Sequence, residues 1–471
     1  MATIDSVEYF NANGARGCLL SQPMKPIRML VCLLAALVTV ESFAATEVLK
    51  ADVRKRVAGD YDYLIDLYRH LHANPELSYM EKETARRMGD ELQKAGFKVS
   101  RNIGGHGVVA LLRNGKGPTI MFRCDLDALP VKEATGLSFA SKRRMKDGAG
   151  NEVFTMHACG HDIHMTSLVG TARLMAAIKD QWKGTLMLIA QPAEERGGGA
   201  RAMLADGLFE KFPVPDKAIA LHVHSSMAAG TIGYTPGFAL ANVDSVDIKI
   251  FGMGGHGAYP HATKDPIVLA AQTILALQTI VSREIAPIEP AVVTVGSIHG
   301  GTKHNVIPGE VDLQLTVRSY SDATREQLLN AIRRIAKGQA IAAGLPEDKM
   351  PIVQVKDEYT PATYNNPELT LRLRNVFDDW LGKGMAMERQ PQMGGEDFGE
   401  YGRTDHKVPI CIFWLGAVSR NSVMQSIKAG KSLPSLHSPL FAPDAEPTIK
   451  TGVATSVGAL LELLNGFAHA Q

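Results

Sequence analysis

The sequence has 471 residues, which is too long for one compact core and fits two domains. Hydrophobic residues make up 45% of the chain and charged residues 21%, values that are ordinary for a globular enzyme. Lys and Arg number 50 against 49 Asp and Glu, so the chain lacks the charge excess that attracts nucleic acids or acidic membrane surfaces.

The N-terminal segment, residues 1–45, has the pattern of a secretory signal peptide. Basic residues precede an apolar run over residues 29–40, and a small-x-small cleavage pattern follows at residues 42–44. The alternative is a buried helix. Because the run is too short to stay across a bilayer, we expect cleavage, export to the periplasm or beyond, and no stable membrane insertion. The polar stretch before Met24 is long for a signal, which makes Met24 or Met29 an alternative start.

Residues 46–236 alternate between helical and strand patterns. Short apolar runs typical of buried strands occur at residues 108–112, 119–125, 184–191 and 217–223. Helical periodicity occupies residues 83–96 and 163–180. This alternation predicts an α/β sheet covered on both faces, and we interpret the segment as the first part of a catalytic domain.

The pattern changes over residues 237–358. Strand, helix, strand, strand, helix and strand are expected in turn at residues 244–253, 265–285, 291–300, 310–320, 323–344 and 351–359. This β-α-β-β-α-β order predicts a separate ferredoxin-like α+β domain. Helix and strand patterns resume over residues 359–471, so we expect a catalytic domain in two parts with the smaller domain inserted.

The stretch "MHACGHDIHM" is the densest group of metal-binding residue types. Gly160 permits an extended turn in which Cys159 and His161 both face one point, and a helix is expected from about Asp162, whose carboxylate is a candidate cap. A thiolate and an imidazole at the start of a helix are typical transition-metal ligands. A single Cys-x-His remains weak evidence, because buried structural Cys and His are common.

Other expected strands also end in candidate ligands. In chain order these are Asp125 and Asp127, then Glu194 and Glu195, then His222, with His437 in a late loop. Open α/β sheets gather ligands at the carboxyl ends of their strands. Each residue alone is more often structural than functional, but the set predicts a metal site.

The adjacent carboxylates of Glu194 and Glu195 repel each other unless a cation or a shared proton lies nearby. Neighbouring residues at a strand end point to different sides, so one carboxylate can bind a metal while the other reaches a water held there. That second carboxylate then acts as general base and afterwards as general acid.

The ordered motifs "HANPELSYMEKETA", "RCDLDALP", "MHACGHDIHM", "QPAEERGGGARAML", "LHVH", "GMGGHGAYPHATKDPI", "NVIPGEVDLQLTVR", "GGEDF" and "LHSPLF" resemble one family. They are similar to the hippurate hydrolase and indoleacetyl-amino-acid hydrolase branch of the aminoacylase/carboxypeptidase metallopeptidases. The resemblance runs from about Tyr63 to Leu464 and implies a zinc-peptidase-like catalytic α/β domain.

The resemblance also implies the roles of the site residues. The ligands of a two-metal site match Cys159, His161, Glu195, His222 and His437. Glu194 matches the catalytic base and Asp125 a carboxylate that orients a ligand. The ligand that bridges the ions stays open. The expected ions are two divalent cations per subunit, zinc by default, with manganese, cobalt or nickel as alternatives.

The inserted domain contributes further residues by the same resemblance. His256 matches a residue that reaches across a homodimer interface and stabilises the oxyanion of the partner's reaction. Asn305 and Arg318 match positions that hold the substrate carboxylate, although a surface strand charge remains the alternative for Arg318. His261 is the expected bystander, with a turn role beside its proline.

The sequence departs from the family pattern at several positions. Arg123 stands where relatives outside the branch have a ligating His, and it cannot bind a metal. His224 replaces a residue that is commonly aromatic or small and is either an extra contact or without a role. Glu396 and Asp397 line the site in relatives.

We expect metal-assisted hydrolysis of the amide bond of an N-acyl amino acid, with Glu194 as base and acid. A dipeptidase or an N-carbamoyl-amino-acid hydrolase using the same site is the alternative among enzymes. A metal-binding protein without catalysis is the alternative from another class, and it predicts loss of the base, which the chain retains.

Overall fold

The computed structural model describes residues 47–465. The chain divides into two units, residues 1–52 and 53–471, and the described residues of the first unit, 47–52, are helical. The expected signal peptide lies outside the described residues. All elements below belong to the second unit.

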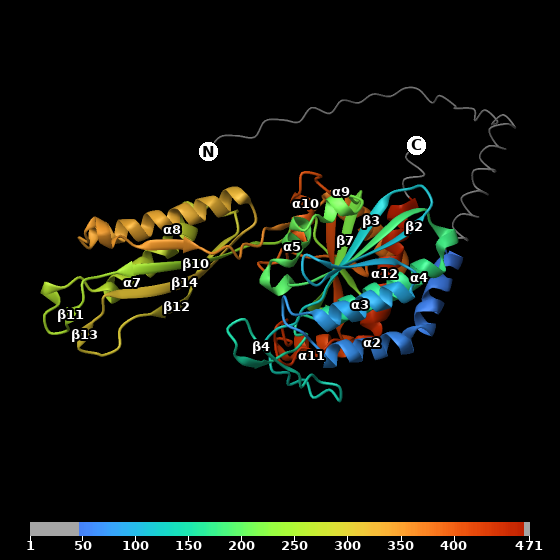
Figure 1. Cartoon of the computed structure of the whole chain (residues 1–471), viewed down its shortest axis with the longest axis horizontal. Coiled ribbons are helices and arrows are strands. Elements are labelled where there is room, and N and C mark those ends of the chain that lie inside the picture. The colour runs from blue at the N-terminus through green and yellow to red at the C-terminus, as the bar shows by residue number, and fades with distance from the viewer. Residues whose placement is uncertain (1–46, 466–471) are drawn as a thin grey trace, which may run out of the picture. The chain divides into compact units, whose positions relative to one another are not determined.

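An eight-stranded sheet forms the centre of the larger part of this unit (Figure 1). Its strands, in spatial order, are β1 (Lys98–Ile103), β2 (Gly107–Asn114), β6 (Gly184–Gln191), β3 (Thr119–Asp125), β7 (Lys217–Ala228), β18 (Ile410–Val418), β8 (Ile232–Tyr234) and β17 (Ala386–Glu388). Strands β6, β3, β7 and β18 run parallel, so their carboxyl ends meet at one edge of the sheet.

Helices cover both faces of this sheet. One face carries α2 (Tyr61–Ala73), α3 (Lys82–Lys94), α4 (His161–Ala177), α9 (Pro367–Leu381) and α12 (Ala445–Asn465). The other carries α5 (Gly199–Ala205), α6 (Leu208–Lys211) and α10 (Gly399–Arg403), which share one hydrophobic core with the strands. The α/β fold expected from the alternating pattern is confirmed, and β6 is buried along its whole length, as a central strand requires.

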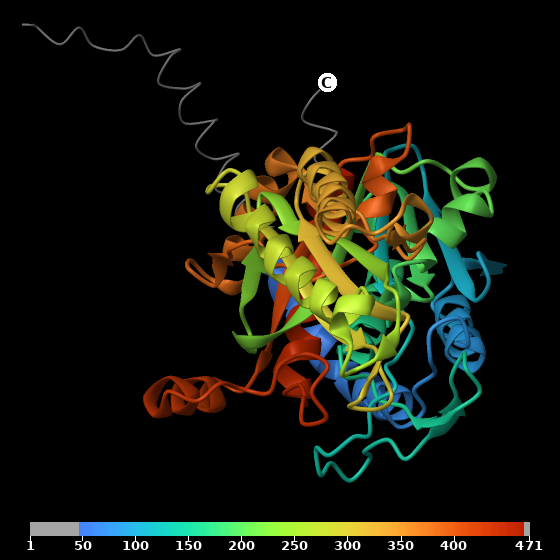
Figure 2. The same cartoon turned by 90° about the vertical axis from the view of Figure 1, so that its left-hand side faces the viewer.

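A second sheet has the order β12-β14-β10-β15, and each neighbouring pair is antiparallel. Along the chain its elements are β10 (Asn242–Phe251), α7 (Pro266–Thr279), β12 (Ala291–His299), β14 (Glu310–Ser319), α8 (Asp322–Ala342) and β15 (Ile352–Val355). Alternate β10 residues are buried, and α7 and α8 form a separate hydrophobic core with the sheet. Figure 2 shows these two helices beside the strands of the sheet. This topology is ferredoxin-like. The division of the chain at residues 236 and 358 stays a prediction.

Two expectations about helices differ from the structure. The helix expected over residues 265–285 is α-helical only as far as Thr279 and continues as a π-helical turn at Ile280–Glu284. Helix α4 begins at His161, and Asp162 is not its N-cap residue. That position belongs to Gly160, but one Asp162 carboxylate oxygen accepts the N–H of Ile163 in the first turn at 2.8 Å, and the other lies 2.7 Å from Nδ1 of His72.

Smaller elements complete the chain. They are the hairpin β4 (Arg144–Lys146) and β5 (Glu152–Phe154), the pair β11 (Gly255–His256) and β13 (Val306–Ile307), the pair β9 (Gly237–Leu240) and β16 (Thr363–Asn365), and helix α11 (Arg420–Ala429). Strands β9 and β16 lie in the two chain segments that connect the sheets, and residues from both sheets line one cavity.

Candidate metal centre

A cavity of about 590 Å³ opens at the carboxyl edge of the large sheet. The predicted site residues that line it are Cys159, Glu194, Glu195, His222, His437 and Arg318. The first five come from the larger part, whereas Arg318 comes from β14 of the second sheet. His256 and Asn305 are not among the lining residues.

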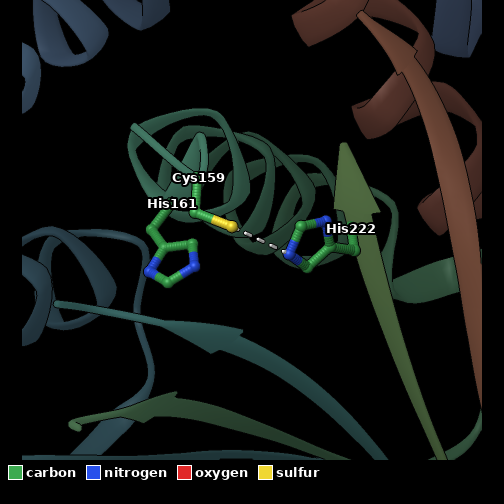
Figure 3. Close-up of side chains that lie close together, drawn as sticks. All are labelled: Cys159, His161 and His222. Carbon is green, nitrogen blue, oxygen red and sulfur yellow. Dashed lines mark hydrogen bonds between the residues drawn. The ribbon is translucent and has the colours of Figure 1, made fainter. Parts of the chain in front are cut away.

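The turn at Gly160 directs Cys159 and His161 to the same side. Gly160 has φ +79°, a left-handed conformation that favours glycine, and a Cβ atom there would lie 2.5 Å from Cγ2 of Val223. Cys159 Sγ lies 3.5 Å from Nε2 of His222, which arrives on β7 (Figure 3). Candidate ligand atoms of Cys159, His161 and His222 all lie within 4.8 Å of one another. The geometry expected for the Cys-x-His motif is therefore present.

Backbone carbonyls fix the ring orientation of both histidines. His161 Nδ1 lies 2.8 Å from the carbonyl oxygen of Asp127, and His222 Nδ1 lies 2.7 Å from that of Val223. Because a carbonyl oxygen only accepts, each Nδ1 must carry a hydrogen and donate it. Nε2 is therefore the ring atom available to a metal in each histidine, as in histidines whose ring orientation is fixed by a backbone carbonyl. Burial alone would lower the pKa of His161, but Asp125, Asp127 and Glu195 raise it to about 10, so a bound metal would displace a proton from its Nε2.

Glu194 and Glu195 lie in a short 3-10 turn, Glu194–Arg196, just beyond the end of β6. Their backbone N–H groups donate to the two carboxylate oxygens of Asp127, at 3.1 and 3.0 Å. The N–H of Ala193, whose φ is +51°, donates to Glu81 at 2.8 Å. Asp127, a candidate ligand by its sequence position, instead accepts hydrogen bonds that hold the turn.

The side chains of the two glutamates then diverge. Both approach Nε2 of His161, at 3.9 Å for Glu194 and 3.8 Å for Glu195. Glu194 also groups with Glu396 and Asp397, whereas Glu195 groups with Cys159 and His437. Glu195 therefore faces the sulfur and imidazole donors, and Glu194 faces a buried acidic group.

Asp125 connects the candidate metal ligands to the buried guanidinium of Arg123. Its carboxylate lies 2.7 Å from Nδ1 of His164 and accepts a 2.9 Å hydrogen bond from Arg123. Nε2 of His164 accepts the N–H of Val223, so both nitrogens of this ring are engaged and neither is left for a metal. Asp125 also lies 3.7 Å from Nε2 of His161.

Arg123 is fully buried and gathers the remaining acids of the site. Its guanidinium lies 3.0 Å from Glu396 and 3.1 Å from Asp397. Burial alone would lower the pKa of Arg123, but Glu396, Asp125 and Asp397 raise it well above its usual value. The sequence excluded Arg123 as a ligand, and the structure shows it as a counter-ion to three carboxylates.

His437 completes the group from a loop. Its N–H donates to the carbonyl of Ala158 at 2.9 Å, and its Nε2 lies 3.4 Å from Glu195. It has φ +66°, an uncommon value for a residue with a side chain, and its side chain is 55% exposed. Among the predicted ligands it is the one open to the cavity mouth.

These residues fit a pair of divalent cations. Nε2 of His161 and Oε1 of Glu195 are buried and have no hydrogen-bond partner among the described residues. Burial raises the pKa of Glu194 well above its usual value, and nearby carboxylates raise it further. Negative charge is therefore unfavourable at this site unless a cation balances it. Thiolate, imidazole and carboxylate donors suit zinc, and the nitrogen and oxygen donors also suit manganese, cobalt or nickel.

Some residues at the site were not found from the sequence. Glu81 supports the Glu194 turn, and its only signal was its place in the motif "HANPELSYMEKETA". Gln392 lines the cavity and touches His224, a residue noted only as an extra contact or one without a role. Gln392 lies outside every motif, so the sequence carried no signal for it.

Comparison with known proteins identifies the class. Residues 121–429 match the model of peptidase family M20/M25/M40. Thermostable carboxypeptidase 2 of Saccharolobus solfataricus is 35% identical over 86% of this chain and 95% of its own length. IAA-amino acid hydrolase ILR1-like 4 of Arabidopsis thaliana is 35% identical over 82% of each chain. The chain therefore belongs to peptidase family M20/M25/M40, and the expected family resemblance is confirmed.

A solved structure supports the same assignment. The YXEP protein of Bacillus subtilis, described as a dinuclear metal-binding peptidase of the M20 family, has a TM-score of 0.70 and 29% identity to this chain. The match covers 87% of this chain and 99% of that protein. The chain thus shares the fold of a family whose members hydrolyse amide bonds.

Proposed function

We propose that this protein is a metal-dependent amidohydrolase that releases an amino acid from its N-acyl group. The observation that carries the proposal is the convergence of Cys159, His161 and His222, with Nδ1 of both imidazoles engaged by backbone carbonyls so that Nε2 is the atom available to a metal. Support for the substrate comes from relatives named for the hydrolysis of IAA-amino acids and for carboxypeptidase activity.

The residues that would hold two divalent ions are Cys159, His161, Glu195, His222 and His437. Bound there, the ions supply Lewis-acid chemistry that polarises a carbonyl and makes a water molecule more acidic. Asp125, which contacts His164 and Arg123, is proposed to hold these ligands in position.

Glu194 is the proposed base and acid. Its carboxylate lies 3.9 Å from Nε2 of His161, but it does not group with Cys159 and His437 as Glu195 does. Burial and the neighbouring carboxylates Glu396 and Glu195 raise its pKa, which favours acceptance of a proton from water. Glu194 then passes that proton to the leaving amine.

Arg318 is proposed to bind the free carboxylate of the substrate, because Arg318 lines the cavity that contains the candidate ligands.

His256 and Asn305 are proposed to reach the site of a second copy. They lie together, since Gly257 donates to the carbonyl of Asn305 and His256 pairs with Val306. Nδ1 of His256 accepts the N–H of Ala258, which leaves an N–H on Nε2 to donate to an oxyanion.

The surface of helix α7, which packs on the second sheet, supports a homodimer formed through this part of the chain. The segment Pro266–Glu284 is long and apolar enough to cross a membrane by length and composition, but only 33% of its apolar window is buried. Val268 and Leu275 on α7 are exposed. Such a surface is typical of an interface with another protein chain.

We also propose that the protein is exported from the cytoplasm. This proposal rests on the sequence pattern alone.

A dipeptidase and an N-carbamoyl-amino-acid hydrolase would use the same ligands and base, so the acyl group distinguishes them. The test is hydrolysis by the purified protein, loaded with zinc or manganese, of a panel of N-acyl amino acids, dipeptides and N-carbamoyl amino acids. We expect N-acyl amino acids to be the best substrates and Glu194→Gln to abolish their cleavage. A parent protein that binds metal but cleaves nothing in the panel would support the non-catalytic alternative.

A further inference from the structure

Gln392 and Trp414 line one wall of the cavity, and His224 contacts both of them. The side-chain amide of Gln392 lies 2.8 Å from Nε2 of His224. The ring of His224 meets Trp414 edge-on, with centroids 5.5 Å apart and planes at 90°. Gln392 and Trp414 both line the cavity. The three side chains therefore form one packed unit at the cavity wall, in which His224 supports Gln392.

The hydrogen bonds of His224 fix the orientation of the Gln392 amide. Nδ1 of His224 accepts the backbone N–H of Ser226 at 3.2 Å, so Nδ1 carries no hydrogen. A neutral imidazole then carries its hydrogen on Nε2 and donates it to Gln392. The structure places Nε2 of Gln392 at this contact, where two N–H groups would meet. A half-turn of the amide exchanges its oxygen and nitrogen, so the amide is assigned the orientation in which its carbonyl oxygen accepts from His224. In that orientation the NH₂ group is the part of the amide turned away from His224.

Gln392 lies beside the proposed carboxylate-binding residue. Arg318 Nη1 donates to the carbonyl oxygen of Met393, the next residue in the chain, at 3.3 Å. The backbone of Gln392 is itself fixed, since its N–H donates to Ala239 at 2.9 Å. The guanidinium and the amide therefore approach the same cavity from neighbouring points, and both present hydrogen-bond donors.

We infer that Gln392 is a specificity-determining residue that donates its amide N–H to the substrate carboxylate beside Arg318, and that His224 is its positioning residue. The inference rests on the proposed function for the identity of the substrate. It assigns a task to His224 and adds a donor from the same chain to the carboxylate site. A neutral carboxamide in place of that carboxylate would gain much less from these donors.

Two substitutions at Gln392 separate its donor role from its packing. Gln392→Glu keeps an oxygen to accept from His224 but presents a second oxygen to the substrate in place of the NH₂ group. Gln392→Met keeps the length of the side chain and removes both hydrogen bonds. We expect KM for an N-acetyl-amino acid to rise about 10- to 100-fold in Gln392→Met, with kcat little changed. The rise should be larger in Gln392→Glu, because like charges then meet.

The matched substrate is the same N-acetyl-amino acid with its carboxylate converted to a carboxamide. Its kcat/KM should change less than about threefold in either variant, so the preference for the carboxylate collapses. His224→Phe keeps a ring against Trp414 and should raise KM for the carboxylate substrate by a smaller factor, about 3- to 10-fold. A structural role for His224 would instead lower activity on both substrates equally.

A binding measurement separates this inference from the proposed reaction. Calorimetric titration of the zinc-loaded Glu194→Gln protein with the carboxylate and carboxamide compounds needs no turnover. We expect Gln392→Glu in that background to weaken only carboxylate binding. Equal carboxylate preference in the parent and both Gln392 variants would overturn the role of Gln392 even if hydrolysis is observed. Absence of all hydrolysis with intact carboxylate-selective binding would refute the reaction and leave the carboxylate site standing.

Discussion

Glu194 and Glu195 are neighbours in the chain, yet their carboxylates enter different groups of side chains. Glu195 lies with Cys159 and His437, while Glu194 lies with Glu396 and Asp397. The turn that separates them is held by the carboxylate of Asp127, which accepts both of their backbone N–H groups. One short turn thus places a candidate ligand and a candidate base about the same imidazole.

This separation predicts different defects for two matched substitutions. Glu195→Gln should lower metal affinity by at least about 100-fold, because a charged ligand is lost. Glu194→Gln should keep the parent metal content and lower kcat by about 10²- to 10⁴-fold, because only proton transfer is lost. Elemental analysis after dialysis, with kcat on an N-acetyl-amino acid, checks both. Loss of metal in Glu194→Gln would show that Glu194 is a ligand.

Arg123 is predicted to stabilise the catalytic fold as a buried counter-ion. Arg123→Met leaves Asp125, Glu396 and Asp397 without the cation they share, so we expect a loss of about 3–5 kcal/mol in the free energy of unfolding. Arg403→Met is the control, because it breaks the exposed pair with Asp322 and should cost at most about 1 kcal/mol. Urea denaturation of the metal-free proteins measures both. Equal losses would contradict a special role for Arg123.

Gly160 offers a test of the turn that aligns Cys159 and His161. Gly160→Ala adds a Cβ atom that would lie 2.5 Å from Val223 and strains a residue at φ +79°. Gly136→Ala introduces the same strain at φ +78°, and apart from its chain neighbours no atom of the described residues would lie within 4 Å of the added Cβ, so it is the matched control. We expect about 1 kcal/mol of destabilisation in Gly136→Ala, a larger loss in Gly160→Ala because of the added clash, and weaker zinc binding only in Gly160→Ala. Zinc titration against a competing chelator distinguishes them.

The sequence predicted the sheets well because local pattern determines them. The strand expected at residues 119–125 coincides with β3, and the run at residues 184–191 coincides with β6. These strands are apolar throughout because helices cover both faces of the sheet, which gives an unambiguous signal. The end of α7 was missed because residues 280–285 keep a helical pattern while their hydrogen bonds change to π-helical ones.

The site residues that could be predicted are those that lie in short sequence motifs. Cys159 and His161 were recognisable because few structural tasks require that pair around a glycine. The partnerships of Asp162 with His72 and of Gln392 with His224 were not, since each joins residues far apart in the chain. The acid cluster around Arg123 likewise depends on strand order, which periodicity does not specify.

We expect the stability of the protein to depend on pH through His72, which is not one of the predicted metal ligands. Burial alone would lower its pKa, but the carboxylates of Asp162 and Glu133 raise it to about 10. A pKa raised above its unfolded value of about 6.5 means that the stabilisation is complete below that pH and is lost as pH rises toward 10. The stability advantage of the parent over His72→Gln should therefore be larger at pH 6 than at pH 9.5.

Urea denaturation at both pH values measures this advantage, and Asn74→Ala, which removes an exposed hydrogen bond near the same helix end, is the control. Its effect on stability should be independent of pH. An advantage for His72 that grows from pH 6 to pH 9.5 would mean that His72 is neutral in the folded protein.

The proposed contribution of His256 to a second copy's site predicts complementation between inactive variants. Glu194→Gln lacks the base and His256→Ala lacks the oxyanion donor, so each homodimer should be inactive or nearly so. In a mixed dimer, one site combines Glu194 from one chain with His256 from the other and is intact. After equal amounts are unfolded and refolded together, about a quarter of the parent activity should return. His261→Ala is the matched control, because this neighbouring histidine has no proposed role and its homodimer should stay active. If the mixture shows no more than the sum of its inactive parents, while light scattering confirms dimers, His256 does not act across the interface.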